Sequence, residues 1–146
     1  MRIQRDFEEL LALLEANRVE YMIVGGYAVA FHGFVRFTKD IDIFYALTTA
    51  NVKRLRTALA KFGFPEKDLP VELFTTKGNI ITFGEAPVRV DLLNRIAGVT
   101  FARAKRHAVR GCYGKTEVTF VGRVDLIRNK RATGRPRDQL DAGELE

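Results

Sequence analysis

The chain has 146 residues, 47% of them apolar, which is enough to bury the core of one ordinary globular domain. Its 24 Lys and Arg residues outnumber 18 Asp and Glu residues, and the net charge of +6 favours phosphate-bearing partners. Charges interrupt every apolar run well short of the roughly 20 residues that a membrane span needs, and the single Cys112 excludes an internal disulfide. We therefore expect one soluble, cytoplasmic domain over residues 1–146.

The first half of the sequence alternates predicted helices with predicted strands. Apolar residues recur at helical spacing over residues 6–17, a helix that we expect Asp6 to cap and Asn17 to end. An amphipathic helix follows later, with Thr48 or Thr49 as its cap. Between these helices, glycines and short apolar runs predict a strand over Tyr21–Val24, a compact helix over Tyr27–Phe31 that ends at Gly33, and a strand over Ile41–Tyr45.

In the second half of the sequence, the spacing of apolar residues changes, and short strand-like runs become frequent. Short runs of β-branched or aromatic residues predict strands over Val71–Phe74, Asn79–Phe83, Val88–Leu93, His107–Arg110 and Thr116–Val121. A helix over Arg123–Arg131 follows, and Gly134 ends it before a last helix over Arg135–Leu145, with Pro136 in its first turn. In the first of these two helices we expect the inward side chains to be Val124, Leu126 and Ile127. The order of elements predicts an α/β (α+β) fold, in which a mixed β-sheet has flanking helices.

Two carboxylates lie on one side of a predicted core strand. Asp40 and Asp42 point the same way because side chains two residues apart on a strand share a face, and their repulsion calls for a cation. Asp91 lies in another strand-like run and would join them if the two strands are neighbours. Three hard oxygen ligands suit Mg²⁺, which shares its open positions with substrate phosphates. The predicted metal ligands are therefore these three aspartates, with Asp91 also able to activate an incoming hydroxyl.

The alternative is a purely local role for the carboxylates. In that case Asp40 pairs with Lys39 or Arg36, and the other two aspartates end their strands at the surface. Gly25 and Gly26 favour a substrate site instead, because they follow a strand and open a helix, where free backbone N–H groups bind phosphate. A phosphate site beside a metal site indicates a nucleoside triphosphate (NTP).

Other site chemistries fit the sequence less well. There is no P-loop run, and the glycine pair lacks the third glycine of a dinucleotide-binding fingerprint. His32 and His107 are too few and too separated for a zinc site, and we expect His32 to be packed or hydrogen-bonded at a helix end. Cys112 has no activating partner in the sequence and is expected in a turn or in the core.

The motifs and their spacing resemble the nucleotidyltransferase superfamily related to DNA polymerase beta. Gly25-Gly26 is followed, after thirteen residues, by Asp40-Ile41-Asp42, and Asp91 lies later between apolar neighbours. The text GGYAVAFHGFVRFTKDID looks closest to the small prokaryotic branch that includes AbiEii-type toxins and minimal nucleotidyltransferases. The closing text DLIRNKRATGRPRDQLDAGEL is similar to the Lys, Gly-Arg, Asp and Asp pattern of many members, so the resemblance covers about residues 20–145.

This resemblance implies a nucleotidyltransferase fold, two Mg²⁺ ions on Asp40, Asp42 and Asp91, and an NTP held at Gly25 and Gly26. The implied reaction is an in-line attack by an acceptor hydroxyl on the α-phosphate, with release of pyrophosphate. The AbiEii-type branch also implies a role in a toxin–antitoxin system. One departure is that many members have Ser in place of Gly26, so a hydroxyl is missing from the phosphate site.

Three basic residues are further candidates for binding the triphosphate: Arg36, Lys130 and Arg135. The sequence leaves a second role open for the last two of them. Both can pair with Asp138 and Asp141, and Arg135 and Asp138 form an i, i+3 pair on the last helix.

Positive charge is concentrated between Arg103 and Arg137, where eleven Lys and Arg residues are opposed in the sequence only by Glu117 and Asp125. RNA, such as a tRNA end, is therefore an expected acceptor of the nucleoside monophosphate, with a protein hydroxyl as the other candidate. The alternative functions are a nucleotide- or RNA-binding module of the same fold without catalysis and, ranked third, a structural partner domain.

Overall fold

The computed structural model describes residues 3–34, 40–85 and 87–146. Its six strands are β1 (Tyr21–Val24), β2 (Asp40–Tyr45), β3 (Ile80–Phe83), β4 (Arg89–Leu93), β5 (Val109–Tyr113) and β6 (Thr116–Phe120). Its helices are α1 (Arg5–Ala16), α2 (Gly25–Phe31), α3 (Thr49–Phe62), the 3-10 helix η1 (Glu66–Asp68), α4 (Val71–Thr75), α5 (Phe101–His107), α6 (Arg123–Thr133) and α7 (Pro136–Leu145). Within the described ranges, no helix combines the length and the apolar character that crossing a membrane requires.

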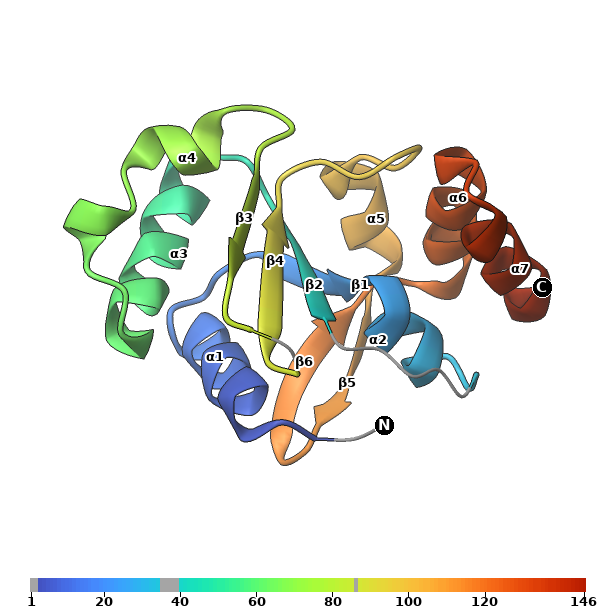
Figure 1. The fold of residues 1–146 in the computed structure, drawn as a ribbon, viewed down its shortest axis with the longest axis horizontal. Coiled ribbons are helices and arrows are strands. Elements are labelled where there is room, and N and C mark those ends of the chain that lie inside the picture. Colours follow the sequence, from blue (N-terminus) through green and yellow to red (C-terminus); the bar gives the residue numbers. More distant parts are fainter. Residues whose placement is uncertain (1–2, 35–39, 86) are drawn as a thin grey trace.

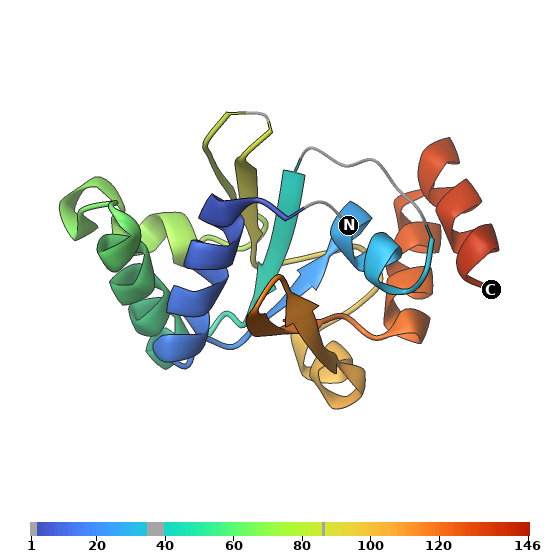
Figure 2. The same cartoon turned by 90° about the horizontal axis from the view of Figure 1, so that it is seen from below.

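The strands form one mixed sheet in the order β3-β4-β2-β1-β6-β5. Strand β2 runs antiparallel to β1 and parallel to β4, and β1 runs parallel to β6. The two outer strands, β3 and β5, are antiparallel to their neighbours. Helices α1 and α3 lie on one side of the sheet, and α6 and α7 lie on the other (Figures 1 and 2). This architecture confirms the predicted mixed sheet with flanking helices.

The core between the sheet and α1 and α3 decides which residues of β2 remain for a site. Ile41, Ile43 and Tyr45 are completely buried on that side, together with four residues of α1, which are Phe7, Leu10, Leu11 and Leu14. Because strand side chains alternate between the two faces, Asp40 and Asp42 point to the opposite face, toward α6 and α7.

Several predicted boundaries are confirmed, and two are wrong. Asn17 is the C-cap of α1, the Thr48 hydroxyl accepts the Asn51 N–H at the start of α3, and Gly134 is left-handed after α6. Asp6 does not cap α1, because that helix already begins at Arg5. Helix α2 begins at Gly25 rather than Tyr27, so the glycine pair forms its first two residues.

The predicted strand over Val71–Phe74 is wrong, because these residues form helix α4. Pro70, with φ −61° and ψ 149°, is the N-cap residue of this helix, where its missing N–H removes no hydrogen bond within the helix. The turn brings Phe74 into the core, where its carbonyl accepts a hydrogen bond of 2.8 Å from the Tyr45 hydroxyl. A run of four residues, three of them apolar, is too short for periodicity to distinguish a helix from a strand.

Helix α5 was absent from the sequence-based prediction, which placed a strand over His107–Arg110. The Thr100 hydroxyl caps this helix by accepting the Arg103 N–H, and strand β5 begins only after it. Two side-chain placements are also wrong. Val124 is 66% exposed, whereas Leu126 is buried, and Cys112 is exposed on β5 instead of lying in a turn or in the core.

Candidate active site

The carboxylates meet on the face of the sheet that points toward α6 and α7. Asp42 of β2 is the register partner of Asp91 of β4, and Asp40 is the partner of Arg89. Because paired residues of neighbouring strands share a face, these four residues form a two-by-two block, here called the carboxylate block. The sequence argument required Asp91 to lie beside Asp42, and this requirement is met.

The Asp42 carboxyl resists ionisation in this setting. Burial, followed by the charge of Asp91, a hydrogen bond with Asp91 and the charge of Asp40, raises the pKa of Asp42 to about 7. The charge of Lys130 on α6 acts in the opposite direction and lowers this pKa. The pKa of Asp42 therefore stays raised although the charge of Lys130 reaches this carboxyl.

Arg89 is the site residue that the sequence argument missed. Its Nε atom lies 3.6 Å from Asp40 Oδ2 and 3.6 Å from Asp91 Oδ1, so a guanidinium lies between two of the carboxylates. Asp91 Oδ1 also accepts a hydrogen bond of 2.7 Å from the Thr82 hydroxyl. The signal was present in the sequence, since Arg89 precedes Asp91 by two residues on the same strand.

The carboxylate block fits Mg²⁺ by its chemistry, although it is not a preformed cage. Three carboxylates offer hard oxygen donors, and the pKa of Asp42 is raised by burial and, after it, by the negative charges of Asp91 and Asp40, which a divalent cation would offset. Among the residues that the structure describes, no three His, Cys, Asp or Glu side chains are already arranged to hold a metal ion. Arg89 lies 3.6 Å from one oxygen each of Asp40 and Asp91, so it would compete with a metal ion for these two carboxylates.

Gly25 is required where β1 turns into α2. Its φ of +70° lies in the left-handed region, and a Cβ atom there would overlap Asp42 Oδ2 and lie 3.1 Å from Asp42 Cγ. The start of α2 and the carboxylate block are thus in contact through this residue. Gly26 follows within the first turn of the same helix.

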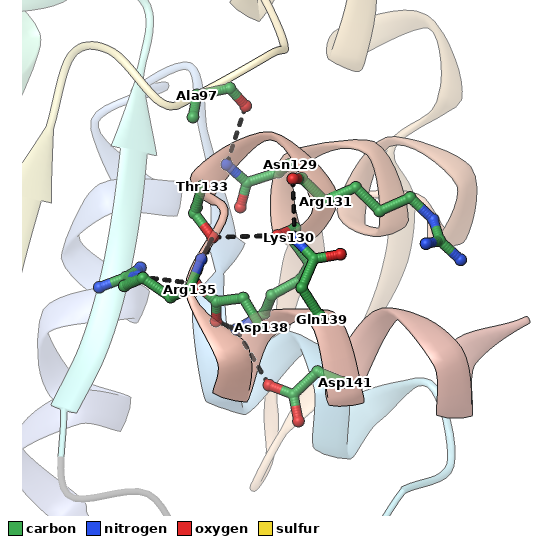
Figure 3. A network of polar contacts seen from close by, with 9 residues as sticks. All are labelled: Ala97, Asn129, Lys130, Arg131, Thr133, Arg135, Asp138, Gln139 and Asp141. Atoms are coloured by element: carbon green, nitrogen blue, oxygen red, sulfur yellow. Dashed lines mark hydrogen bonds and ion pairs between the residues drawn. The ribbon is translucent and has the colours of Figure 1, made fainter.

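The predicted phosphate ligands Lys130 and Arg135 lie in a polar network between α6 and α7 (Figure 3). Lys130 Nζ lies 2.9 Å from Asp138 Oδ1 and 3.2 Å from Asp141 Oδ2, and Arg135 Nε donates to Asp138 Oδ2 over 2.8 Å. This arrangement confirms the local pairing that the sequence allowed. The third candidate, Arg36, lies outside the described residues, as does Lys39.

Lys130 joins this network to the carboxylate block. The residue is only 7% exposed, and its charge acts on both Asp138 and Asp42. Burial opposes ionisation of Asp138, but hydrogen bonds from Thr133 and Lys130 outweigh burial and lower the pKa of this carboxyl.

Replacing Lys130 by Met should lower the free energy of unfolding at pH 7 by about 3 kcal/mol, because two buried carboxylates lose their shared cation. Arg137→Met on α7 is the matched control, since Arg137 is exposed and forms no ion pair with any residue described, and it should change stability by less than about 0.5 kcal/mol. Urea denaturation measures both values. Equal stabilities for the two variants would show that the network contributes nothing, whereas partial recovery in a Lys130→Met, Asp138→Asn double variant would support it.

Acidic residues from distant segments neutralise much of the basic stretch between Arg103 and Arg137. Lys105 pairs with Glu20, and Arg110 binds both carboxylate oxygens of Glu15 at 3.0 Å. The sequence count of two opposing acids was therefore too low, because it considered only acids within the stretch. One further expectation is confirmed: His32, the C-cap of α2, has Nε2 2.8 Å from the Val121 carbonyl oxygen.

Comparison with known proteins supports the fold. No family model matches the chain, and no curated protein sequence matches it. Among solved structures, the chain is similar to an antigenic nucleotidyltransferase-like protein from Paracoccidioides brasiliensis, with a TM-score of 0.54 and 14% sequence identity. The alignment covers 98% of this chain and 75% of that chain. The chain thus has a nucleotidyltransferase-like fold, and its assignment to the AbiEii-type branch stays a prediction.

Proposed function

We propose that this protein is a Mg²⁺-dependent nucleotidyltransferase that moves a nucleoside monophosphate from an NTP to a hydroxyl of RNA or of a protein. The observation that carries the proposal is the direct register of Asp42 with Asp91, with Asp40 on the same face. The nucleotidyltransferase-like fold supports it independently of these side chains. A role in a toxin–antitoxin system is also part of the proposal, and it rests only on the resemblance of residues 25–42 to the AbiEii-type branch.

In this proposal, Asp40, Asp42 and Asp91 hold two Mg²⁺ ions. Bound Mg²⁺ supplies a Lewis acid that lowers the pKa of the acceptor hydroxyl and stabilises the charge of the departing pyrophosphate. Asp91 takes the hydroxyl proton as the acceptor oxygen bonds to the α-phosphorus and the bond from that phosphorus to the bridging oxygen breaks. Asp42 must lose its own proton before it can act as a ligand, which occurs near pH 7.

The triphosphate would lie beside the start of α2 and the carboxylate block, which are in contact with each other. Gly25 and Gly26 offer backbone there without side chains, and the contact of Gly25 with Asp42 supports placing phosphate and metal together. Lys130 approaches from α6 with a charge that reaches Asp42. Arg36 and Arg135 remain proposed phosphate ligands, and Arg135 would have to leave Asp138 to act as one.

The second candidate function is a nucleotide- or RNA-binding module of the same fold without turnover. Two observations favour it, because Arg89 already contacts two of the three carboxylates and Lys130 is held by Asp138 and Asp141. If these ion pairs persist when substrate is present, the protein binds nucleotide but does not assemble the reactive geometry.

A label-transfer assay separates the two functions. The wild type is incubated with each α-labelled NTP, Mg²⁺ and either total RNA or cell protein, beside Asp42→Ala, Asp91→Asn and the exposed control Asp68→Asn. We expect transfer by the wild type and the control, and a loss of about a thousandfold in both site variants. Mg²⁺-dependent NTP binding without transfer would favour the module. If the wild type neither transfers nor binds any NTP, the transferase and a nucleotide-binding module are both excluded, and only an RNA-binding module remains.

A further inference from the structure

A cavity lies beyond the carboxyl ends of the parallel strands β2 and β4. Its volume is about 540 Å³, within the range of small-ligand sites. The apolar part of its lining includes Phe44, Ile96, Val99 and Phe101, and its two cations are Lys77 and Arg95. The carboxylate block contributes no residue to it.

The cavity lies close to the carboxylate block on the same face of the sheet. Phe44 follows Asp42 by two residues on β2, so the Cα atoms of the two are only about 7 Å apart. The ring of Phe101 approaches the ring of Phe44 edge to face, with centroids 5.1 Å apart. A ligand in the cavity can therefore place a neighbouring group over Asp42.

The wall of the cavity is fixed to α6. The segment from Ile96 to Val99 forms a tight turn closed by a bridge between these two residues. The Asn129 side-chain amide donates to the Ala97 carbonyl over 3.0 Å, and Gly98 lies against Ala132. These contacts hold the cavity in shape without a ligand, which lowers the entropic cost of binding.

The two cations that line the cavity have no acidic partner among the described residues, unlike several cations of the basic stretch between Arg103 and Arg137. Lys77 and Arg95 are exposed, and neither forms an ion pair with any residue that the structure describes. Arg128 lies behind Gly98 on α6 and is likewise without an ion pair among those residues. Lys105 and Arg110, in contrast, are paired with glutamates. Two cations without an ion pair among the described residues therefore line this cavity, and a third, Arg128, lies behind its wall.

We propose that this cavity binds one nucleotide unit of a single-stranded RNA acceptor. The base lies on Phe101 and the apolar lining, and its phosphate contacts Lys77 and Arg95, since unpaired bases are recognised by stacking and backbone phosphates by cations. The following nucleotide then carries its hydroxyl to the carboxylate block. This inference rests on the proposed nucleotidyl transfer and identifies its acceptor as RNA rather than protein.

The test is binding of a short fluorescein-labelled single-stranded RNA, measured by anisotropy over a series of salt concentrations. The site variant is Lys77→Glu with Arg95→Glu. The matched control is Lys53→Glu with Arg54→Glu, which makes the same change in net charge at two exposed positions of α3. We expect the site variant to bind the RNA at least about tenfold more weakly. The slope of log K against log salt concentration should become less steep by about 1.4, which corresponds to the loss of two phosphate contacts on a single strand. The control should change the affinity by less than about threefold.

Phe101→Leu tests the stacking contact. It should weaken binding by about fivefold or more without changing the salt slope. Equal losses in the site variant and the control, or no salt-dependent RNA binding by the wild type, would overturn the inference.

Mg²⁺-dependent NTP binding is measured on the same preparations. RNA binding at the cavity without NTP binding would refute the proposed transferase and leave the RNA site. NTP binding and label transfer to protein, without RNA binding, would support the proposed transferase and refute the RNA site.

Discussion

Replacing Asp42 by Asn should stabilise the metal-free protein above pH 7 by about 2 to 4 kcal/mol while abolishing transfer. The expected gain follows from the pKa of Asp42, which rises from 3.8 to about 7 on folding, at 1.4 kcal/mol per unit before solvent screening reduces it. A neutral amide keeps the shape of the side chain and removes the repulsion from Asp91 and Asp40.

The same shift in the pKa of Asp42 determines the pH window of this effect. Between about pH 4 and pH 7 the folded state retains a proton that the unfolded state has lost, so the wild type loses stability relative to Asp42→Asn as the pH rises. The difference in unfolding free energy between the two proteins should therefore be near zero at pH 4 and constant above pH 7. Denaturant titrations at a series of pH values measure it.

Two further results would bear on this prediction. Adding Mg²⁺ above pH 7 should stabilise the wild type and leave Asp42→Asn unchanged, because only the wild type retains the complete ligand set. The exposed Asp68→Asn should show neither effect. A wild type that is more stable than Asp42→Asn above pH 7 without metal would mean that cations of the chain, Arg89 among them, already neutralise the carboxylates.

Replacing Gly25 by Ala should lower the free energy of unfolding by about 3 kcal/mol and reduce transfer by at least about a hundredfold. The left-handed backbone at φ +70° contributes about 1 to 2 kcal/mol of this loss, and the overlap of the new methyl group with the Asp42 carboxylate contributes the rest. Displacing that carboxylate should in addition misplace a metal ligand, to which the reaction rate is very sensitive.

Gly134→Ala is a close control for this prediction. Gly134 has a φ of +71°, and no atom lies within 4 Å of the position that its Cβ would occupy. This control should therefore show the backbone loss of about 1 to 2 kcal/mol without the steric one, and transfer should be unaffected. Thermal unfolding and label transfer measure both variants. Similar losses in the two proteins would show that the contact between Gly25 and Asp42 is unimportant.

The parts of the fold that could be predicted are those in which hydrophobic period and end signals agree. Helix α1 shows both, with apolar residues at helical spacing and Asn17 at its end. Helices α4 and α5 were mispredicted for different reasons. The three apolar residues of α4 are compatible with a strand, and the hydrogen bond from Tyr45 to the Phe74 carbonyl is visible only in the folded chain. Helix α5 has few apolar residues to define its period.

The sequence predicted which carboxylates form the candidate site, but it did not predict which cations of the chain pair with them. The alternation of strand side chains placed Asp40 and Asp42 together, and the apolar run around Asp91 indicated a second strand. Which strands are neighbours depends on long-range pairing that the sequence does not display. The spacing of Arg89 and Asp91 on one strand was visible in the sequence, but the contact of Arg89 with Asp40 depends on this pairing, and the partners of Lys105 and Arg110 became visible only in the folded chain.

The most direct test of the account is to locate the metal in crystals of the protein grown with Mn²⁺, alone and with non-hydrolysable analogues of the four NTPs. We expect an anomalous scattering peak coordinated by oxygens of Asp42 and Asp91, with Arg89 displaced and the triphosphate beside Gly25. An anomalous peak elsewhere, or none while Arg89 still contacts Asp40 and Asp91, would contradict the assignment of this face as a nucleotidyltransferase site.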